Sequence, residues 1–494
     1  MPADDRPSPA PTPTEGPAAA VPEPADDLVV THHELGSGPD ALRYTATTGR
    51  VVLREEVVED GRSRGVQPRA QLFSTSYVLD GADPATRPVT FAFNGGPGSS
   101  SVWLHMGLLG PRRVVMGDAG DLAPPPYALA DNLQTLLRVS DLVFIDPVST
   151  GYSRTHEGHT ADDFHGFTRD VESVGEFIRL WTSRNGRWLS PKFLAGESYG
   201  TTRAAALAGH LATGCGMYVN GLVLISSVLD IGSVDFEPGS DLGYALYLPT
   251  YTAAAHFHGR VDGELRARVA EAEEFAAREL PWALGRGSRL TGEERSAVVA
   301  RYAELTGLSP GYVDRADLRV DLFAFTAELL REERTLIGRL DMRFTGWLAD
   351  PNDARMTGHD PSSAAIMGPY SATLNAYLRG ELGYASDLTY NVLTPKVHPW
   401  SYKEFEGRSV EATGALTTAM QANPHMRVHI ACGWYDGATP HFAAEHVMAH
   451  LRVPPAALDR VEWAYYEAGH MMYVHEPSRL QQSADLADFV TRAC

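Results

Sequence analysis

The residues best suited to chemistry in this sequence surround a serine flanked by glycines. Gly196, Ser198 and Gly200 form a G-x-S-x-G pattern, with a short apolar run before it and an alanine-rich stretch without proline after it. This order predicts a strand, a sharp turn and a helix, and glycines suit the turn because a Cβ on either side would crowd it. Ser198 would stand at a helix N-terminus, where backbone N–H groups favour a developing oxyanion. The pattern indicates a nucleophilic serine rather than a serine in an ordinary loop.

A serine hydroxyl needs a base, and the base needs a carboxylate that fixes its tautomer. Asp436 lies in the turn after one strand-like run, and His470 follows a glycine at the end of the next. The resulting order of Ser, Asp and His is that of hydrolases built on a strand-turn-helix serine. His475 is the alternative base, and Asp146, at another strand end, is the alternative acid. Because the chain has 18 histidines, position rather than residue type distinguishes His470.

A glycine cluster supplies a second candidate part of the site. Residues 94–101 read Asn-Gly-Gly-Pro-Gly-Ser-Ser-Ser and directly follow an apolar run. A flexible loop would have a similar composition. After a buried strand, however, such a cluster is suited to bring backbone N–H groups close to a ligand.

The elements that must position these residues alternate between strand and helix patterns. Residues 164–181 show apolar positions at helical spacing before the serine strand. Two runs of alternating residues, 42–56 and 70–79, are interpreted as antiparallel edge strands. Further runs are strand-like and alternate with helical patterns, and several of them are continuously apolar, which predicts an α/β fold with a mainly parallel central sheet flanked by helices on both faces. These runs are residues 88–93, 142–145, 193–195, 219–225, 427–431 and 460–466.

The alternation stops after about residue 235. Residues 236–400 are interpreted as a mostly helical cap inserted over the sheet edge, with helical stretches at 260–279, 316–339 and 364–382 and no convincing strand up to residue 347. The expected organisation is therefore a Pro/Ala-rich disordered segment, a core in two parts and the cap between them. The boundaries are 1–27 for the disordered segment, 28–235 and 401–494 for the core, and 236–400 for the cap.

Composition excludes several classes of protein. A formal net charge of −20 over 494 residues argues against nucleic acid as a partner, because phosphates would be repelled. Neither a secretory signal nor a run of membrane-spanning length is found, so the expected location is the cytoplasm, without membrane partners. Cys215, Cys432 and Cys494 are too few and too widely spaced for a disulfide framework or a metal cluster. No metal or organic cofactor is expected, and the sequence indicates no particular oligomeric state.

Four ordered blocks of this chain together resemble the serine carboxypeptidase family. They are the segments 93–100, 196–200, 433–440 and 469–471, and the segment 141–153 between them is also similar. The resemblance spans about residues 40–235 and 400–494. It implies an α/β-hydrolase fold with a helical cap. It also implies catalysis by Ser198, Asp436 and His470, an oxyanion hole from the backbone N–H groups of Gly96 and Tyr199, and binding of the substrate's C-terminal carboxylate by Asn94, Gly95 and Glu197.

The chain departs from this family pattern at two positions. A second glutamate usually assists carboxylate binding, but Leu108 occupies its place. Ser99 stands where secreted relatives have a disulfide cysteine. Both departures fit a leaderless, bacterial-type intracellular branch. Glu197 binds an anionic group only if one proton is shared between the two carboxyl groups, which predicts a pH dependence.

The leading hypothesis is a serine carboxypeptidase whose partner is a peptide with a free C-terminal carboxylate. An esterase or acyltransferase using the same three residues is the alternative, because an acyl-enzyme passes its acyl group to water or to another acceptor. A binding protein without catalysis is a third class. It is disfavoured because Ser198, Asp436 and His470 are all intact.

Overall fold

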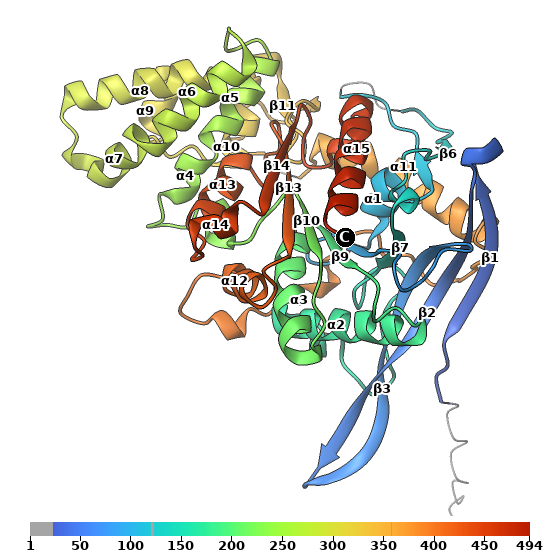
Figure 1. Ribbon diagram of the computed structural model, residues 1–494. Helices are drawn as coiled ribbons and strands as arrows, with labels where there is room; N and C mark the ends of the chain where they lie inside the picture. The colour runs from blue at the N-terminus through green and yellow to red at the C-terminus, as the bar shows by residue number, and fades with distance from the viewer. Residues whose placement is uncertain (1–22, 120–122, 357) are drawn as a thin grey trace, which may run out of the picture.

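The computed structural model describes residues 23–119, 123–356 and 358–494, and a ten-stranded sheet lies at its centre (Figure 1). The strand order is β1-β2-β3-β7-β4-β9-β10-β13-β14, with β8 paired to β3. The strands are β1 (Asp27–Leu35), β2 (Leu42–Glu59), β3 (Arg62–Leu79), β4 (Val89–Phe93), β7 (Asp141–Ile145), β8 (Arg154–Thr155), β9 (Lys192–Glu197), β10 (Gly221–Ile225), β13 (Arg427–Gly433) and β14 (Val461–Tyr466). Two further strands, β5 (Arg112–Val114) and β6 (Leu129–Asp131), form a separate antiparallel pair.

The sheet has an antiparallel side and a parallel side. Strands β1, β2, β3 and β7 pair antiparallel in succession, and every pair from β7 across to β14 is parallel. This arrangement confirms the predicted α/β-hydrolase architecture. The interpretation of residues 42–56 and 70–79 as edge strands was wrong, because β1 pairs with the outer side of β2 and because β3 lies between β2 and β7. The sequence did not reveal β1 because only one of its two faces packs on the protein, and polar residues interrupt its apolar pattern.

Helices cover both faces of the sheet, as the continuous apolar runs predict. All five residues of β4 are buried, and they alternate between the faces. Phe91 and Phe93 pack with helices α2 (Phe167–Arg184), α3 (Tyr199–Cys215), α12 (Thr413–Ala422) and α13 (His441–Ala449). Ala92 belongs to the opposite cluster, which includes α1 (Val102–Leu104), α11 (Pro361–Gly380) and α15 (Glu476–Arg492). The loops at the strand ends are therefore held on a rigid support.

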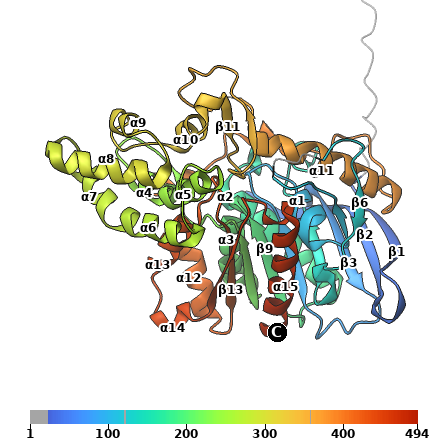
Figure 2. The ribbon, with the colours of Figure 1, turned by 90° about the horizontal axis from the view of Figure 1, so that it is seen from above.

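Most of the segment after β10 forms a helical unit with its own apolar core. Figure 2 shows these helices to one side of the sheet, while α11 runs across its top. The unit comprises α4 (Leu242–Leu246), α5 (Leu248–Phe257), α6 (Leu265–Ala277), α7 (Glu279–Arg286), α8 (Gly292–Thr306), α9 (Pro310–Arg315) and α10 (Leu322–Glu328). Helix α11 packs instead into a cluster on the sheet. Helix α14 (Pro455–Leu458) precedes β14.

The cap contains a short hairpin that the sequence pattern did not predict. Strands β11 (Thr335–Ile337) and β12 (Thr345–Trp347) pair antiparallel, so the predictions of a helix over 316–339 and of no strand before residue 347 were wrong. Only Leu322–Glu328 of that range is α-helical, beginning where Asp321 caps the Ala324 N–H. Arg334, at a φ of 55°, turns the chain immediately before β11.

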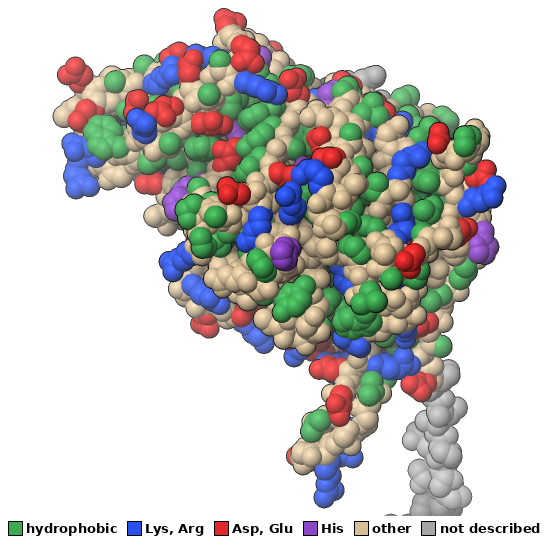
Figure 3. Space-filling model, viewed as in Figure 1, with side chains coloured by type: hydrophobic (Ala, Val, Ile, Leu, Met, Phe, Trp, Pro, Cys, Tyr) green, Lys and Arg blue, Asp and Glu red, His purple; other side chains and the backbone are tan. Residues whose placement is uncertain are grey.

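The surface of the cap carries charges of both signs close together. On the face drawn in Figure 3, acidic and basic side chains are interspersed over the cap helices. Several are ion pairs one helical turn apart, such as Arg268 with Glu271 and Arg301 with Glu304. Among the described residues, no helix is long and apolar enough to cross a membrane.

The segment expected to be disordered comprises residues 1–27, and its residues 1–22 lie outside the described residues. Its C-terminal end is ordered. The Asp26 carboxylate accepts a hydrogen bond from the Val52 N–H, and Asp27 begins β1 and pairs with Arg50 at 2.6 Å. The boundary of the core therefore lies before residue 26 rather than at residue 28.

Candidate active site

Loops at the carboxyl ends of four parallel strands bring the candidate residues together. Strand β4 leads into Asn94, β9 into Ser198, β13 into Asp436 and β14 into His470. The carboxyl ends of parallel strands lie at one edge of a sheet, where α/β proteins bind their ligands. A pocket of about 440 Å³ opens there, and its lining includes Asn94, Gly95, Gly96, Glu197, Ser198 and His470.

Ser198 occupies a strained turn between β9 and α3. Its φ of 60° and ψ of −132° lie outside the conformations that a non-glycine residue prefers. The flanking glycines are needed there. A Cβ on Gly196 would lie 2.1 Å from the Gly200 carbonyl oxygen, and one on Gly200 would lie 2.8 Å from that of Phe93. The turn therefore has the tight geometry that the G-x-S-x-G pattern predicts.

The two expected oxyanion donors lie on either side of this turn. Tyr199 is the first residue of α3, and Gly96, with a φ of 107°, belongs to the loop after β4. The loop and the turn are in close contact, because a Cβ on Gly95 would lie 2.4 Å from the Tyr199 nitrogen. Among the described residues, no backbone carbonyl accepts either the Gly96 or the Tyr199 N–H. Gly96 also lines the pocket, and both N–H groups are available as donors.

Asp436 orients His470. The His470 Nδ1 donates to Asp436 Oδ2 at 2.9 Å, and Asp436 Oδ1 accepts from the backbone N–H groups of Ala438 and Thr439. Burial disfavours both charges. The attraction between the two groups and their hydrogen bond nevertheless raise the pKa of His470 and lower the pKa of Asp436. The charge of Glu197 also raises the pKa of His470.

Ser198 and His470 line the same pocket, but no hydrogen bond joins their side chains among the described residues. Catalytic hydrogen bonds often tighten only when substrate binds. The alternative residues lie elsewhere. His475 Nδ1 bonds to the Ser478 hydroxyl at the start of α15, and Asp146 accepts hydrogen bonds from Ser101 and Tyr390. Neither alternative hydrogen-bonds with Ser198 or His470.

Glu197 forms a hydrogen-bonded group beside Ser198. Asn94 Nδ2 donates to its Oε1 at 2.8 Å, and the Tyr473 hydroxyl donates to its Oε2 at 2.6 Å. Burial raises the pKa of Glu197 to about 7, despite opposing effects from His470, Tyr473 and Asn94. A buried carboxyl that is half protonated near neutral pH therefore lies in the wall of the pocket.

A buried ion pair holds Asn94 in place. Arg203 pairs with Asp170 at 2.7 Å, and its Nη1 donates to the Asn94 carbonyl oxygen at 2.6 Å. The Leu104 N–H donates to Asn94 Oδ1, which leaves the Asn94 amide nitrogen directed at Glu197. Arg203 was not predicted from the sequence, although an isolated charge in the alanine-rich stretch after Ser198 was a signal for it.

Comparison with known proteins agrees with this geometry. The sequence model of the family described as serine carboxypeptidase matches residues 69–228. The resemblance to the serine carboxypeptidases is confirmed. The matched segment includes Asn94, Gly96, Glu197, Ser198 and Tyr199. Asp436 and His470 lie outside it, so their assignment depends on the geometry alone.

The curated relatives match over part of their lengths. Serine carboxypeptidase-like 16 of Arabidopsis thaliana is 26% identical over 180 residues, which are 34% of this chain and 39% of that protein. Serine carboxypeptidase-like 33 of the same plant is 30% identical over 132 residues, 26% of each chain. Similar solved structures include a proline iminopeptidase of Mycobacterium smegmatis, with a TM-score of 0.34, 12% identity and coverage of 94% of this chain and 98% of that one. An open-form lipase has a TM-score of 0.33, 13% identity and coverage of 90% and 99%. At these TM-scores the likeness adds nothing to the fold derived from the strand order. The family match and the strand-end geometry support a serine hydrolase.

The structure explains how this chain differs from the serine carboxypeptidase pattern. Leu108 is buried in the apolar cluster and offers no carboxyl group. Tyr473 instead supplies the second hydrogen bond to Glu197. Tyr473 was not predicted from the sequence, because 276 residues separate it from Glu197 and no local pattern links them. The Ser99 hydroxyl accepts a hydrogen bond from the Trp103 indole, and all three cysteines are free thiols.

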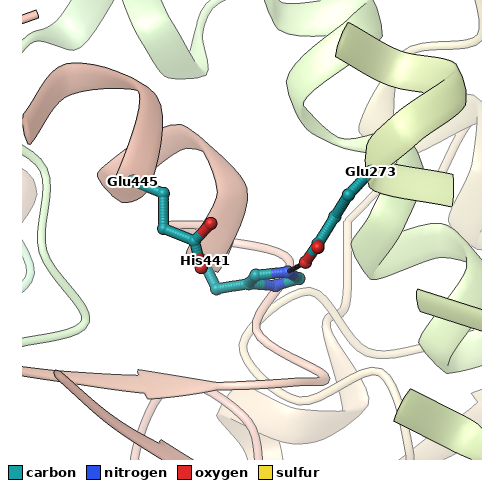
Figure 4. Close-up of side chains that lie close together, drawn as sticks. All are labelled: Glu273, His441 and Glu445. Atoms are coloured by element: carbon teal, nitrogen blue, oxygen red, sulfur yellow. Dashed lines mark hydrogen bonds and ion pairs between the residues drawn. The ribbon is translucent and has the colours of Figure 1, made fainter. Parts of the chain in front are cut away.

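A second group of ionisable side chains lies where the cap meets the core. Glu273 of α6 faces His441 and Glu445 of α13 (Figure 4), and their candidate ligand atoms lie within 4.8 Å of one another. Each side chain already has a protein partner. His441 Nε2 bonds to Glu273 at 2.9 Å, and the Tyr465 hydroxyl donates to Glu445 at 2.6 Å. We interpret the group as a polar contact that fixes the cap on the core.

Proposed function

We propose that this protein is a serine carboxypeptidase that removes the C-terminal residue of peptides through an acyl-enzyme on Ser198. The observation that carries the proposal is the buried Glu197 carboxyl. It lies beside the nucleophile, is hydrogen-bonded to Asn94 and Tyr473, and has a pKa of about 7. Such a group neither attacks the substrate carbonyl nor carries the transferred proton in acyl transfer. It is suited to hold the free carboxylate of a substrate, because in its protonated form it donates a hydrogen bond where an ionised group would repel.

In the proposed reaction, His470 takes the proton of Ser198 as the hydroxyl oxygen attacks the carbonyl carbon of the last peptide bond. The carbonyl oxygen becomes an oxyanion, which accepts hydrogen bonds from the N–H groups of Gly96 and Tyr199. Asp436 keeps Nδ1 of His470 protonated, so that Nε2 is the atom that receives the proton.

The tetrahedral intermediate collapses when the carbon–nitrogen bond breaks. His470 returns its proton to the leaving amine, and the amino acid departs with its carboxylate from Glu197 and Asn94. Water, deprotonated by His470, then attacks the ester on Ser198 and releases the shortened peptide. His470 must be neutral before it can accept the proton of Ser198. The value of kcat therefore falls at pH values below the pKa of His470.

A second function, esterase or acyltransferase, is favoured by one observation. Leu108 stands where carboxypeptidases usually have the second carboxylate-binding glutamate, and it is buried among apolar residues. A site with weaker carboxylate recognition would keep the chemistry of Ser198 and accept acyl donors without a free terminus.

Two measurements test the proposal. A fluorophosphonate probe followed by digestion is expected to label Ser198, and a label on another residue would refute the nucleophile assignment. The two functions are separated by KM against pH for one peptide and its C-terminal amide. The KM of the peptide is expected to rise above pH 7 as Glu197 ionises, whereas that of the amide stays flat or improves. Identical profiles would favour the esterase or acyltransferase.

A further inference from the structure

One cation of the pocket has no partner. Arg339 comes from the cap, is half-buried and lines the same pocket as Ser198 and His470. Among the described residues, its guanidinium forms no ion pair and no hydrogen bond. Half-buried arginines usually pair with a carboxylate, because the fork of N–H donors fits a carboxylate well. A free guanidinium beside the nucleophile therefore points to an anion that arrives with the substrate.

The backbone around Arg339 is fixed against the catalytic loops. We name residues 338–344 the clamp loop. The Leu340 carbonyl accepts the His470 N–H at 2.6 Å, and the Met342 N–H donates to the Tyr435 carbonyl at 3.0 Å. The backbone N–H of Arg339 itself donates to the Asp360 carboxylate at 3.1 Å. The guanidinium therefore extends from a rigid support, which is what a selective binding group requires.

The neighbouring carboxylates are already engaged. Asp341 of the clamp loop pairs with Arg343 at 2.7 Å, and Asp436 is bonded to His470. Glu197 accepts from Asn94 and Tyr473. The charge of Arg339 nevertheless acts on His470, because it lowers the pKa of His470 against the raising effect of Asp436. Within the described part of the chain, Arg339 thus lines the pocket with a charge that no carboxylate pairs with.

The inference rests on the proposed function, in which Asn94 and Glu197 hold the terminal carboxylate of the leaving residue. The acyl part of the substrate is then the part that remains to contact Arg339. Arg339 lines the pocket together with Leu340 and Ala438, which come from the cap and from the turn beside Asp436. We propose that Arg339 is an anion-binding subsite for the acyl part of the substrate, which selects peptides with Asp or Glu in the penultimate position.

The test compares two substrates that differ in one charge. Blocked Glu-Phe and Gln-Phe dipeptides have nearly the same shape, so the ratio of their kcat/KM values measures recognition of the carboxylate. The ratio is expected to favour Glu by about ten- to a hundred-fold, the size of one charge-assisted hydrogen bond. Arg339→Met is expected to bring the ratio close to one, and Arg339→Lys to keep part of it.

The control is Arg278→Met. Arg278 is an exposed arginine of the cap that pairs with Glu274, with 74% of its side chain accessible, and its loss changes the net charge equally. This variant is expected to keep the wild-type ratio. Labelling of Ser198 by a fluorophosphonate reports whether each variant is folded. Should Arg339→Met fail to fold, Arg339→Gln replaces it, because glutamine keeps a polar head.

Three results would overturn the inference. They are a wild-type ratio near one, an unchanged ratio in Arg339→Met, and an equal loss on both dipeptides, which would place the terminal carboxylate at Arg339. Ethyl esters of blocked Glu and Gln separate this inference from the proposed function. A preference for Glu among esters without hydrolysis of peptides refutes the carboxypeptidase and keeps the subsite. Hydrolysis of peptides without a preference for Glu keeps the carboxypeptidase and refutes the subsite.

Discussion

Replacing Glu197 with glutamine should make the protein more stable at alkaline pH. The pKa of the Glu197 carboxyl is about 7 in the folded protein, against a value of 4.5 without burial. Between pH 4.5 and about pH 7, Glu197 therefore keeps its proton in the folded state and has lost it in the unfolded state. The stabilisation that is present below pH 4.5 is therefore lost as pH rises through 7. A difference of about 2.5 pH units corresponds to roughly 3 kcal/mol.

Glutamine suits this position because it is neutral at every pH and nearly the same shape. Its oxygen accepts from Asn94, and its amide donates to the Tyr473 hydroxyl, which turns to accept. The measured quantity is the free energy of unfolding in urea at pH 5 and at pH 8. We expect the advantage of Glu197→Gln over wild type to be larger at pH 8 by on the order of 3 kcal/mol.

The matched control is Glu274→Gln, which removes an exposed carboxylate of the cap, with 63% of its side chain accessible. It should show no comparable gain between pH 5 and pH 8. Kinetics provide an independent readout. In Glu197→Gln the KM of free-carboxylate peptides should no longer rise with pH. The acid limb of kcat should move to lower pH, because the charge that raises the pKa of His470 is gone. An advantage over wild type that is equal at pH 5 and pH 8 would refute the reasoning.

Three further substitutions test the site. Ser198→Ala should lower kcat by about a million-fold with an unchanged unfolding curve, and an alanine variant with ordinary turnover would exclude the nucleophile. Tyr473→Phe removes a hydrogen bond that lowers the pKa of Glu197, so the rise of KM should move to higher pH; a shift to lower pH would contradict this. Gly196→Ala places a Cβ 2.1 Å from the Gly200 carbonyl oxygen and should destabilise the protein by more than 2 kcal/mol, as roughly expected for overpacking with strain. Urea unfolding measures this cost, and a neutral result would show that the turn relaxes.

The sequence predicted the parts of the molecule that depend on short-range patterns. The turn at Ser198 follows from two glycines and the runs on either side of it. The placement of Asp436 and His470 follows from strand ends, which a parallel sheet brings to one edge. Their roles in catalysis stay predictions.

What the sequence did not reveal depends on contacts between distant segments. Tyr473 reaches Glu197, and Arg203 reaches Asn94, through packing that no local pattern records. Strand β1 has a weak apolar pattern because one of its faces does not pack on the protein. The hairpin of β11 and β12 consists of two three-residue strands, which are too short to show alternation. Arg339 lies beside that hairpin, so its position depended on an element that was not foreseen.

In the proposed reaction, the clamp loop makes the cap part of the catalytic apparatus. The backbone of His470 bonds to Leu340 of the cap, and the Gly469 N–H donates to Asp341 of the same loop. An exchange of caps between relatives therefore does more than exchange one wall of the pocket, because it also resets the position of the base. We expect changes in the inserted segment to be tolerated only where they preserve this anchor. In engineering and in evolution, the range of substrates and the rate of the reaction are consequently inherited together.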